Sequence, residues 1–205
     1  SARVIFTSCS AAGSGGAAGD AAAAQVPGQG VWANYDFVPG DRILFFDDFS
    51  TSPVGDFPPH LEFIKGNMET VESQGRRYLR ATSYSEIDIP LPEILPERYT
   101  IEFDYYGPHY GQNQVSLYFD AAGSDQGGQD DFVTFFHYLH CGVNEHNHGD
   151  KAGIDLPEEY QKGLVRCRIM GNGRYLKVYG NDIRVSNVPN AVITRTNKIR
   201  LNLWA

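Results

Sequence analysis

Strict alternation of apolar and polar residues in short segments is the feature that most restricts the fold of this chain. Over Tyr99–Tyr105, Tyr, Ile, Phe and Tyr occupy every second position, with Thr, Glu and Asp between them. Lys198–Leu203 shows the same period of two. Successive side chains of a strand point to opposite faces, so such segments bury one face and leave the other in water, which is typical of antiparallel sheets.

From Val31 onward, short apolar or alternating runs are separated by Gly, Pro, Asn and Asp, which is the pattern of strands joined by turns. Twelve Tyr, twelve Phe and 22 Gly also favour β-structure, and Gly171–Gly173 predicts a hairpin turn. The predicted strands are Arg42–Asp47, Leu61–Lys65, Glu69–Glu72, Arg77–Ala81, Ser85–Ile89, Tyr99–Tyr105, Val115–Phe119, Phe132–His140, Leu164–Met170, Tyr175–Tyr179 and Lys198–Leu203. One flat antiparallel sheet does not comfortably accommodate this many strands. We therefore expect an all-β fold, an antiparallel two-sheet β-sandwich of jelly-roll type.

The amino-terminal part has a different composition. Residues 11–30 contain eight Ala and six Gly, too little apolar surface for a core and typical of a flexible tether. We therefore expect an extended Ala/Gly-rich arm at 1–30 and a β-sandwich domain at 31–205. Ordering such an arm costs about 1–2 kcal/mol per residue, so we expect a partner protein to bind it, with folding back over its own domain as the alternative. The predicted partner-binding residues are Val4, Ile5, Phe6, Val26, Val31 and Trp32.

The charge and hydropathy of the chain exclude two kinds of partner. Lys and Arg total 17 against 25 Asp and Glu, a formal net charge of −8. Broad electrostatic binding of nucleic acid or of an anionic membrane surface is not expected at this charge. No apolar run approaches the roughly 20 residues that span a bilayer, so no transmembrane segment is expected in this chain.

The three cysteines leave two questions open. Cys141 and Cys167 both fall in segments predicted as strands, where they would form either a disulfide or two small buried apolar side chains. The segment Val4–Cys9 loosely resembles the end of a bacterial lipoprotein signal, which makes Cys9 a candidate for lipidation.

Several segments resemble a known family. Tyr35–Ser50 is similar to the start of a domain found in bacterial OmpA-family envelope proteins, with further matches at Val54–Pro58, Leu95–Asp104 and Asn187–Asn190. The resemblance covers about residues 32–205. It implies a concanavalin A/laminin G-like sandwich and a location in the periplasm or the bacterial cell envelope. With the arm, it predicts a non-enzymatic accessory subunit that stabilises a larger periplasmic or membrane-associated complex by binding other protein subunits of an envelope or inner-membrane assembly.

Two groups of residues are candidate metal ligands. His146 and His148 are two apart, so on a strand both rings would lie on one face, as a chelating pair requires. Asp47 and Asp48 would offer the oxygen ligands that Ca²⁺ prefers, and the family resemblance implies a structural calcium ion near such acids. The alternative for these aspartates is the capping of turns.

An aromatic loop supports the alternative function, a carbohydrate-binding lectin-like domain that is calcium-stabilised. The aromatic rings of the loop at residues 105–110 would form a platform on which a glycan packs. Trp32 and Trp204 are further candidates for this platform. The predicted ligand-binding residues are Tyr105, Tyr106, His109 and Tyr110.

The sequence predicts no enzyme. The acid pairs Glu86–Asp88 and Glu102–Asp104 lack the third acid of sandwich glucanases, so both are interpreted as polar faces of strands. The chain also lacks the GxSxG motif of a serine hydrolase.

Overall fold

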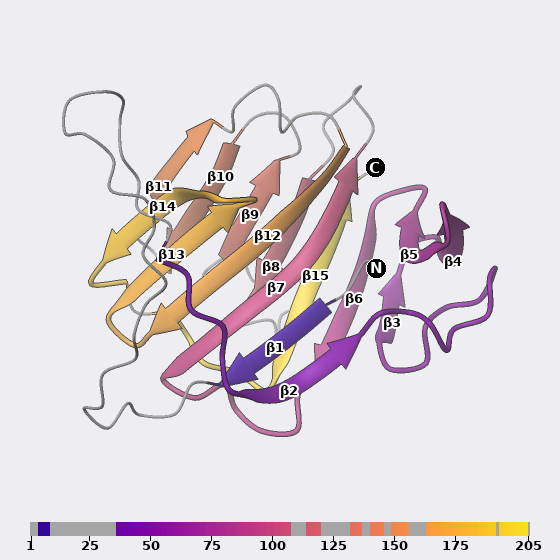
Figure 1. The fold of residues 1–205 in the computed structure, drawn as a ribbon, viewed down its shortest axis with the longest axis horizontal. Coiled ribbons are helices and arrows are strands. Elements are labelled where there is room, and N and C mark those ends of the chain that lie inside the picture. Colours follow the sequence, from indigo (N-terminus) through magenta and orange to yellow (C-terminus); the bar gives the residue numbers. More distant parts are fainter. Residues whose placement is uncertain are drawn as a thin grey trace.

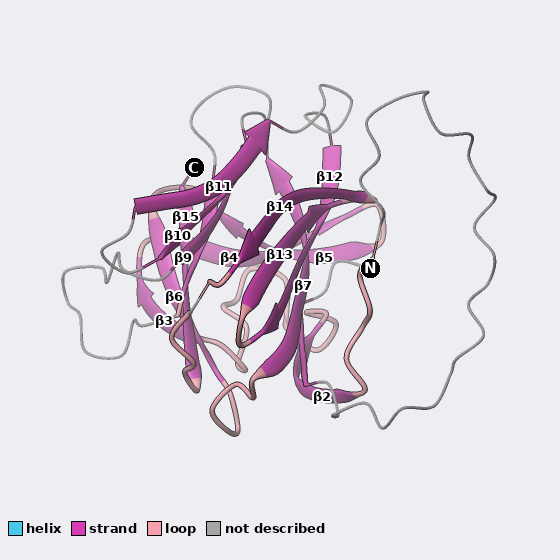
Figure 2. Cartoon of the chain, turned by 90° about the vertical axis from the view of Figure 1, so that its left-hand side faces the viewer, coloured by secondary structure: helices cyan, strands magenta, loops and turns pink. Residues whose placement is uncertain are grey.

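The computed structural model describes residues 4–8, 36–107, 114–119, 132–136, 140–145, 149–155, 163–191 and 193–204. These residues form fifteen β-strands and no helix, in two packed antiparallel sheets and one separate hairpin (Figures 1 and 2). The hairpin consists of β4 (Met68–Ser73) and β5 (Arg76–Ala81). The predicted all-β sandwich is therefore confirmed.

The first sheet, sheet A, has six strands. In spatial order they are β14 (Ile183–Pro189), β13 (Tyr175–Gly180), β12 (Gly163–Asn172), β7 (Arg98–Gly107), β1 (Val4–Ser8) and β2 (Arg42–Asp47).

The second sheet, sheet B, has seven strands. In spatial order they are β11 (Gly149–Asp155), β10 (His140–Glu145), β9 (Phe132–Phe136), β8 (Gln114–Tyr118), β15 (Lys198–Trp204), β6 (Ser85–Pro90) and β3 (Glu62–Lys65). At one end of the sandwich β11 contacts β14 of sheet A. At the other end each sheet finishes in an edge strand, β2 or β3.

The core lies between the inner faces of the two sheets (Figure 2). Alternation places Ile101 and Phe103 of β7 inward, and both are buried. They meet inward residues of sheet B, and the rings of Phe103 and Phe135 pack edge to face with their centroids 5.2 Å apart. Cys167 is a fully buried free thiol, and burial raises its pKa well above the ordinary value. It packs as a small apolar side chain and forms no disulfide.

Most predicted strands occur at or within a few residues of their expected positions. The hairpin turn is also confirmed, since Gly173 has a φ of 78° and Asn172 Oδ1 accepts hydrogen bonds from the two amides that follow it. The segment predicted as one strand over Phe132–His140 differs, because β9 ends at Phe136 and β10 begins at His140. Four strands were not predicted: β1, β11, β14 and β10, which the prediction reached only at His140.

Strand β1 changes the expected division of the chain. Its backbone pairs with β2 on one side and with β7 on the other, with Val4 opposite both Asp47 and Phe103. Residues 4–8 thus form part of the sandwich, whereas the sequence assigned them to an arm outside it. The reason is that their β-propensity is satisfied by strands distant in sequence, which the Ala/Gly composition of residues 11–30 does not reveal.

The outer face of sheet A is partly covered by the chain itself. The segment that leads into β2 crosses this face (Figure 1), and Asp36 accepts hydrogen bonds from Tyr179 Oη at 2.7 Å and Arg184 Nη1 at 3.0 Å. Lys177 forms an ion pair with the same carboxylate, and the Phe37 ring packs edge to face on Tyr179. Partial burial opposes ionisation, but the hydrogen bonds from Lys177 and Tyr179 outweigh it and lower the pKa of Asp36.

We predict that Asp36→Asn lowers the free energy of unfolding at pH 7 by about 1–3 kcal/mol, because it leaves two cations without their carboxylate. The pKa of Asp36 is lower in the folded state, so its contribution is present above the unfolded value of about 3.9 and is lost as the pH falls. The difference from wild type should therefore shrink at pH 3. Urea denaturation at both pH values measures it. Asp182→Asn, in the exposed β13–β14 turn, is the matched control, and an equal effect of both substitutions would contradict the prediction.

Candidate functional site

The outer face of sheet B carries an unusual set of buried polar residues. Because Ile87 and Ile89 of β6 point into the core, Glu86 and Asp88 point outward, yet they are only 6% and 3% exposed. The register places Glu86 beside Asn202 of β15, and Asn202 beside Ser116 of β8. Polar groups on the outer face of a sheet usually lie in water, yet sheet A also buries such groups, where Glu102 and Asp104 pair with Arg168 and Arg166. The row on sheet B differs in having the exposed ring of Trp204 on the same face, which makes it the candidate site.

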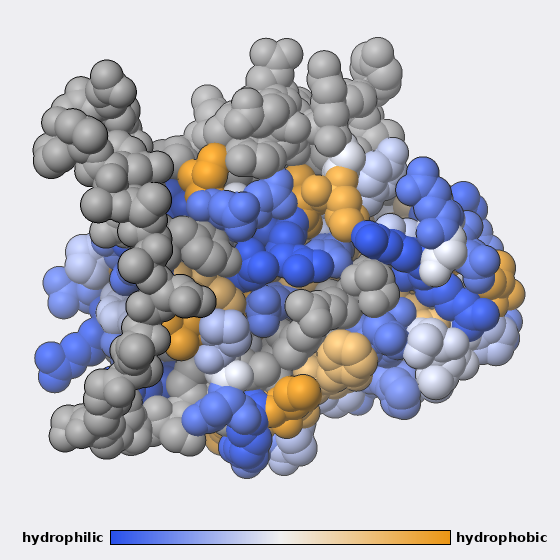
Figure 3. Space-filling model, in the orientation of Figure 1, coloured by the Kyte–Doolittle hydropathy of each residue, from blue (hydrophilic) through white to orange (hydrophobic). Residues whose placement is uncertain are grey.

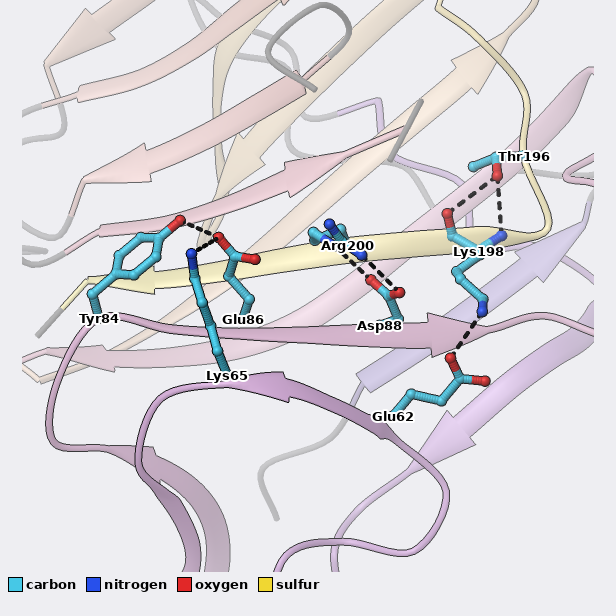
Figure 4. Close-up of polar contacts among 8 residues, drawn as sticks. All are labelled: Glu62, Lys65, Tyr84, Glu86, Asp88, Thr196, Lys198 and Arg200. Carbon is cyan, nitrogen blue, oxygen red and sulfur yellow. Dashed lines mark hydrogen bonds and ion pairs between the residues drawn. The ribbon is translucent and has the colours of Figure 1, made fainter. Parts of the chain in front are cut away.

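Glu86 is held by two neighbours (Figure 4). Tyr84 Oη donates a hydrogen bond to Glu86 Oε1 at 2.5 Å, and Lys65 Nζ lies 3.2 Å from the same oxygen. Burial, together with Glu86, raises the pKa of Tyr84 far above its ordinary value of 10, so the phenol remains a hydrogen-bond donor. The orientation of the Glu86 carboxylate is therefore fixed from two sides.

Asp88 is held by Arg200 of β15, which lies directly opposite it in the sheet. The guanidinium binds in bidentate fashion, with Nε 2.9 Å from Oδ1 and Nη2 3.1 Å from Oδ2. Both side chains are largely buried. A fork of this kind fixes the planes of both groups and is stronger than a hydrogen bond between neutral groups.

A third ion pair, between Lys198 and Glu62, lies on the same face as the pairs of Glu86 with Lys65 and of Asp88 with Arg200. Lys198 Nζ lies 2.8 Å from Glu62 Oε2 of β3, and this hydrogen bond raises the pKa of Lys198. Thr196 Oγ1 accepts a hydrogen bond from the Lys198 backbone amide at 3.1 Å, as Figure 4 shows. The three acids and three bases of these pairs give this strip of surface a formal net charge of zero.

Asn202 lies at the centre of the row and is only 4% exposed. Its Oδ1 is buried and has no hydrogen-bond partner among the described residues. Next to it, the hydroxyls of Ser116 and Thr134 bond to each other at 2.8 Å. A buried carbonyl oxygen without a donor costs about 1–3 kcal/mol, so this position favours a ligand or water molecule that supplies one.

Aromatic rings flank the polar row. The rings of Tyr84 and Trp204 meet edge to face with centroids 4.6 Å apart, and Trp204 is 46% exposed at the end of β15. Further along the face, Tyr118 and Phe132 are also paired, with centroids 5.3 Å apart. The face therefore combines oriented hydrogen-bonding groups with an accessible aromatic surface, the combination that positions a polar ligand with apolar faces.

The structure does not assemble the predicted aromatic loop into a platform. Tyr105 and Tyr106 are consecutive in β7, so they lie on opposite faces of sheet A. Tyr105 packs against the core, while Tyr106 is 63% exposed. The expectation that both rings form one platform is wrong for this reason. His109 and Tyr110 lie outside the described residues.

The predicted aspartate ligands have other partners. Asp47 Oδ1 accepts a hydrogen bond from the amide of Phe49 at 2.7 Å, and Asp48 Oδ1 accepts one from Ser50 at 3.0 Å. The hydrogen bonds from Ser50 lower the pKa of Asp48. Within the described part of the chain no three His, Cys, Asp or Glu side chains are grouped to hold a metal ion. The two aspartates cap a tight turn through their Oδ1 atoms, which is the alternative expected from the sequence, and calcium binding by these residues stays a prediction. His146 and His148 lie outside the described residues.

The predicted partner-binding residues are placed only in part. Val4, Ile5 and Phe6 lie in β1, where their backbone is paired within the chain. Val26, Val31 and Trp32 lie outside the described residues. Partner binding by these six residues therefore stays a prediction. No helix among the described residues has the length and hydrophobicity needed to cross a membrane.

The sequence predicted the acids of the polar row as one face of a strand but did not predict their partners. The interpretation of Glu86–Asp88 as a polar strand face is confirmed, but its partners Arg200 and Asn202 were not predicted as site residues. The alternation in Lys198–Leu203 does place Lys198, Arg200 and Asn202 on one face. What the sequence lacks is the pairing of β15 with β6, which brings that face beside the two acids.

Comparison with known proteins establishes the fold and no family. No protein-family model matches the sequence, and neither does any curated protein. A Bacillus subtilis protein of unknown function with a galectin-like fold superposes with a TM-score of 0.50 and 12% identity, over 71% of this chain and 82% of that one. The carbohydrate-binding module CBM66 from Bacillus subtilis gives a TM-score of 0.48 and 18% identity over 71% and 88% of the two chains. For the Bacillus licheniformis β-glucanase the values are 0.46 and 14%, over 74% and 82%.

The similarity with a TM-score of 0.50 supports a galectin-like β-sandwich fold. At such low identity it shows the fold alone. Membership of the OmpA family and a location in the envelope remain predictions, because no family model matches.

We predict that Arg200→Leu lowers the free energy of unfolding by about 3–5 kcal/mol, because it leaves the buried Asp88 carboxylate unpaired. The double variant Asp88→Leu/Arg200→Leu should lose much less, since no uncompensated charge remains. Denaturant titration at pH 7 measures both. Arg80→Leu, which breaks a largely exposed pair with Glu69, should cost under about 1 kcal/mol. A loss for Arg200→Leu no larger than for Arg80→Leu would contradict the assignment.

Proposed function

We propose that this protein is a carbohydrate-binding, lectin-like module that binds glycans on the outer face of sheet B. The observation that carries the proposal is the buried polar row of Glu86, Asp88, Arg200 and Asn202 beside the exposed ring of Trp204. Sugars present hydroxyls that donate and accept hydrogen bonds, together with flat C–H faces that pack on aromatic rings. The Asn202 carbonyl oxygen would accept from such a hydroxyl, and Trp204 offers the packing surface.

The charge arrangement favours neutral glycans. Each carboxylate of the row already has a basic partner, and the strip has a formal net charge of zero. An acidic polysaccharide would have to compete with Glu62, Glu86 and Asp88 for those cations. A neutral chain of hydroxyls disturbs none of the three ion pairs.

Binding without hydrolysis fits the same geometry. Glycoside hydrolysis requires a protonated acid and a second carboxylate on either side of the scissile bond. Here Glu86 and Asp88 lie on one strand and each is bound to a cation, while the next outward position of β6 is Pro90. We propose a non-enzymatic role on this basis.

The accessory-subunit role predicted from the sequence has less support. It depended on an arm that a partner protein immobilises, whereas residues 4–8 pair within the sandwich. A glycan-binding role depends on described side chains, and we therefore prefer it.

Affinity electrophoresis in native gels tests the proposal with a panel of soluble polysaccharides. The neutral members are a mannan, a β-glucan, a galactan and a fructan, and the acidic members are an alginate and a sulfated galactan. We expect at least one neutral polysaccharide to retard the protein, with no retardation by the acidic ones. Trp204→Ala and Asn202→Ala should each weaken that binding about tenfold or more, which corresponds to about 1.4 kcal/mol.

Tyr106→Ala is the matched control, because it removes an exposed aromatic ring from the outer face of sheet A and should leave binding unchanged. The proposal is overturned if no polysaccharide in the panel retards the protein, or if only Tyr106→Ala abolishes retardation.

A further inference from the structure

Strand β2 is an edge strand whose outer side exposes two large apolar residues. Among the described strands it pairs only with β1, and no other described strand lies along its outer edge. Ile43 is 63% and Phe46 is 45% exposed, and hydrophobic surface lies along the position of β2 in Figure 3. An apolar edge of this kind accepts a further strand readily unless it is protected.

A β-bulge gives β2 an unusual pattern of faces. Phe6 of β1 pairs with Phe45, and the next residue, Thr7, pairs with Ile43, so Leu44 is the inserted residue. Leu44 is buried, and Phe45 packs against the core. Two consecutive residues therefore face inward, with the outward Ile43 on one side of them and the outward Phe46 on the other.

This pattern makes β2 complementary to itself. When two copies of Arg42–Asp47 run antiparallel about the midpoint between Leu44 and Phe45, Ile43 lies opposite Phe46, Leu44 opposite Phe45, and Arg42 opposite Asp47. Directly opposite residues of an antiparallel pair share a face, and the two central pairs do so: Ile43 and Phe46 both face outward, and Leu44 and Phe45 both face inward. A shift by one residue would set Ile43 against an inward-facing Phe45. No like charges, which would be destabilising, lie opposite each other in this register.

We propose that β2 is the interface of a twofold-symmetric dimer, in which the β2 strands of two copies pair antiparallel in this register and join their six-stranded sheets edge to edge. The contact is isologous, as in most soluble homodimers. Backbone hydrogen bonds set the alignment, and the Ile43–Phe46 contacts cover the apolar surface. The interface lies in sheet A and does not involve the glycan-binding face of sheet B, so it stands independently of the proposed function.

Disulfide trapping between two full-length variants tests the register. Ile43→Cys and Phe46→Cys chains are mixed, oxidised gently and run on a non-reducing gel, with each variant alone and the wild type as controls for the native cysteines. Opposite residues have Cα atoms about 4.5–5.5 Å apart, within disulfide range. Two copies of residue 43 are offset by three positions, or about 10 Å. We expect several-fold more covalent dimer in the mixture than in either variant alone, with the 43–46 linkage identified by mass spectrometry.

Light scattering after size exclusion tests the dimer itself. Wild type should shift from monomer to dimer as its concentration rises, and Ile43→Lys should remain monomeric. Val54→Lys, which adds the same charge at another exposed apolar residue, should behave as wild type. The proposal is overturned by a wild type that stays monomeric up to its solubility limit, by equal effects of the two lysine variants, or by cross-links without the 43–46 preference.

Discussion

The packing of two inner sheet faces against each other determines everything that the outer faces can present. Edge-to-face contact between Phe103 and Phe135 joins the sheets at the core, and the alternation of each strand then fixes which of its residues face outward. Because Ile87 and Ile89 are buried in the core, the alternation along β6 places Glu86 and Asp88 on the outer face. The recognition surface is thus a consequence of core packing.

The outer faces of the two sheets differ in what lies against them. On sheet A, the segment beginning at Asp36 is held by Lys177, Tyr179 and Arg184, so the chain itself covers part of that surface. On sheet B, the charged groups are paired with one another, as Asp88 is with Arg200. The outer face of sheet A also carries ion pairs between its strands, Asp104 with Arg166 and Glu102 with Arg168, and the Arg168 guanidinium lies over the Phe37 ring of the crossing segment. What distinguishes sheet B is the exposed ring of Trp204 beside its polar row.

The alternation of apolar and polar residues within single segments predicted the strands. The candidate site depends on the pairing of strands that are distant in sequence, which such alternation does not reveal. The period of two in Tyr99–Tyr105 predicted β7 and its buried face correctly. The same period also implies that Tyr105 and Tyr106 cannot share a face, and the aromatic-platform hypothesis was wrong because it treated them as a loop. The pairing of Arg200 with Asp88 spans 112 residues. Such pairing depends on strand order, which alternation alone leaves undetermined.

The ion pairs of sheet B fit the proposed glycan-binding role better than a role in stability. Replacing a buried ion pair by well-packed apolar residues is often neutral or stabilising, so the pair of Asp88 and Arg200 adds little net stability to a sandwich that has a large apolar core. What the bidentate contact does provide is a fixed orientation of both groups, close to the Asn202 oxygen, which has no hydrogen-bond partner among the residues that the structure describes. Preoriented side chains lose less conformational entropy when a ligand binds to them. The same rigidity that contributes little to folding therefore favours the binding of a hydroxyl-rich ligand on this face.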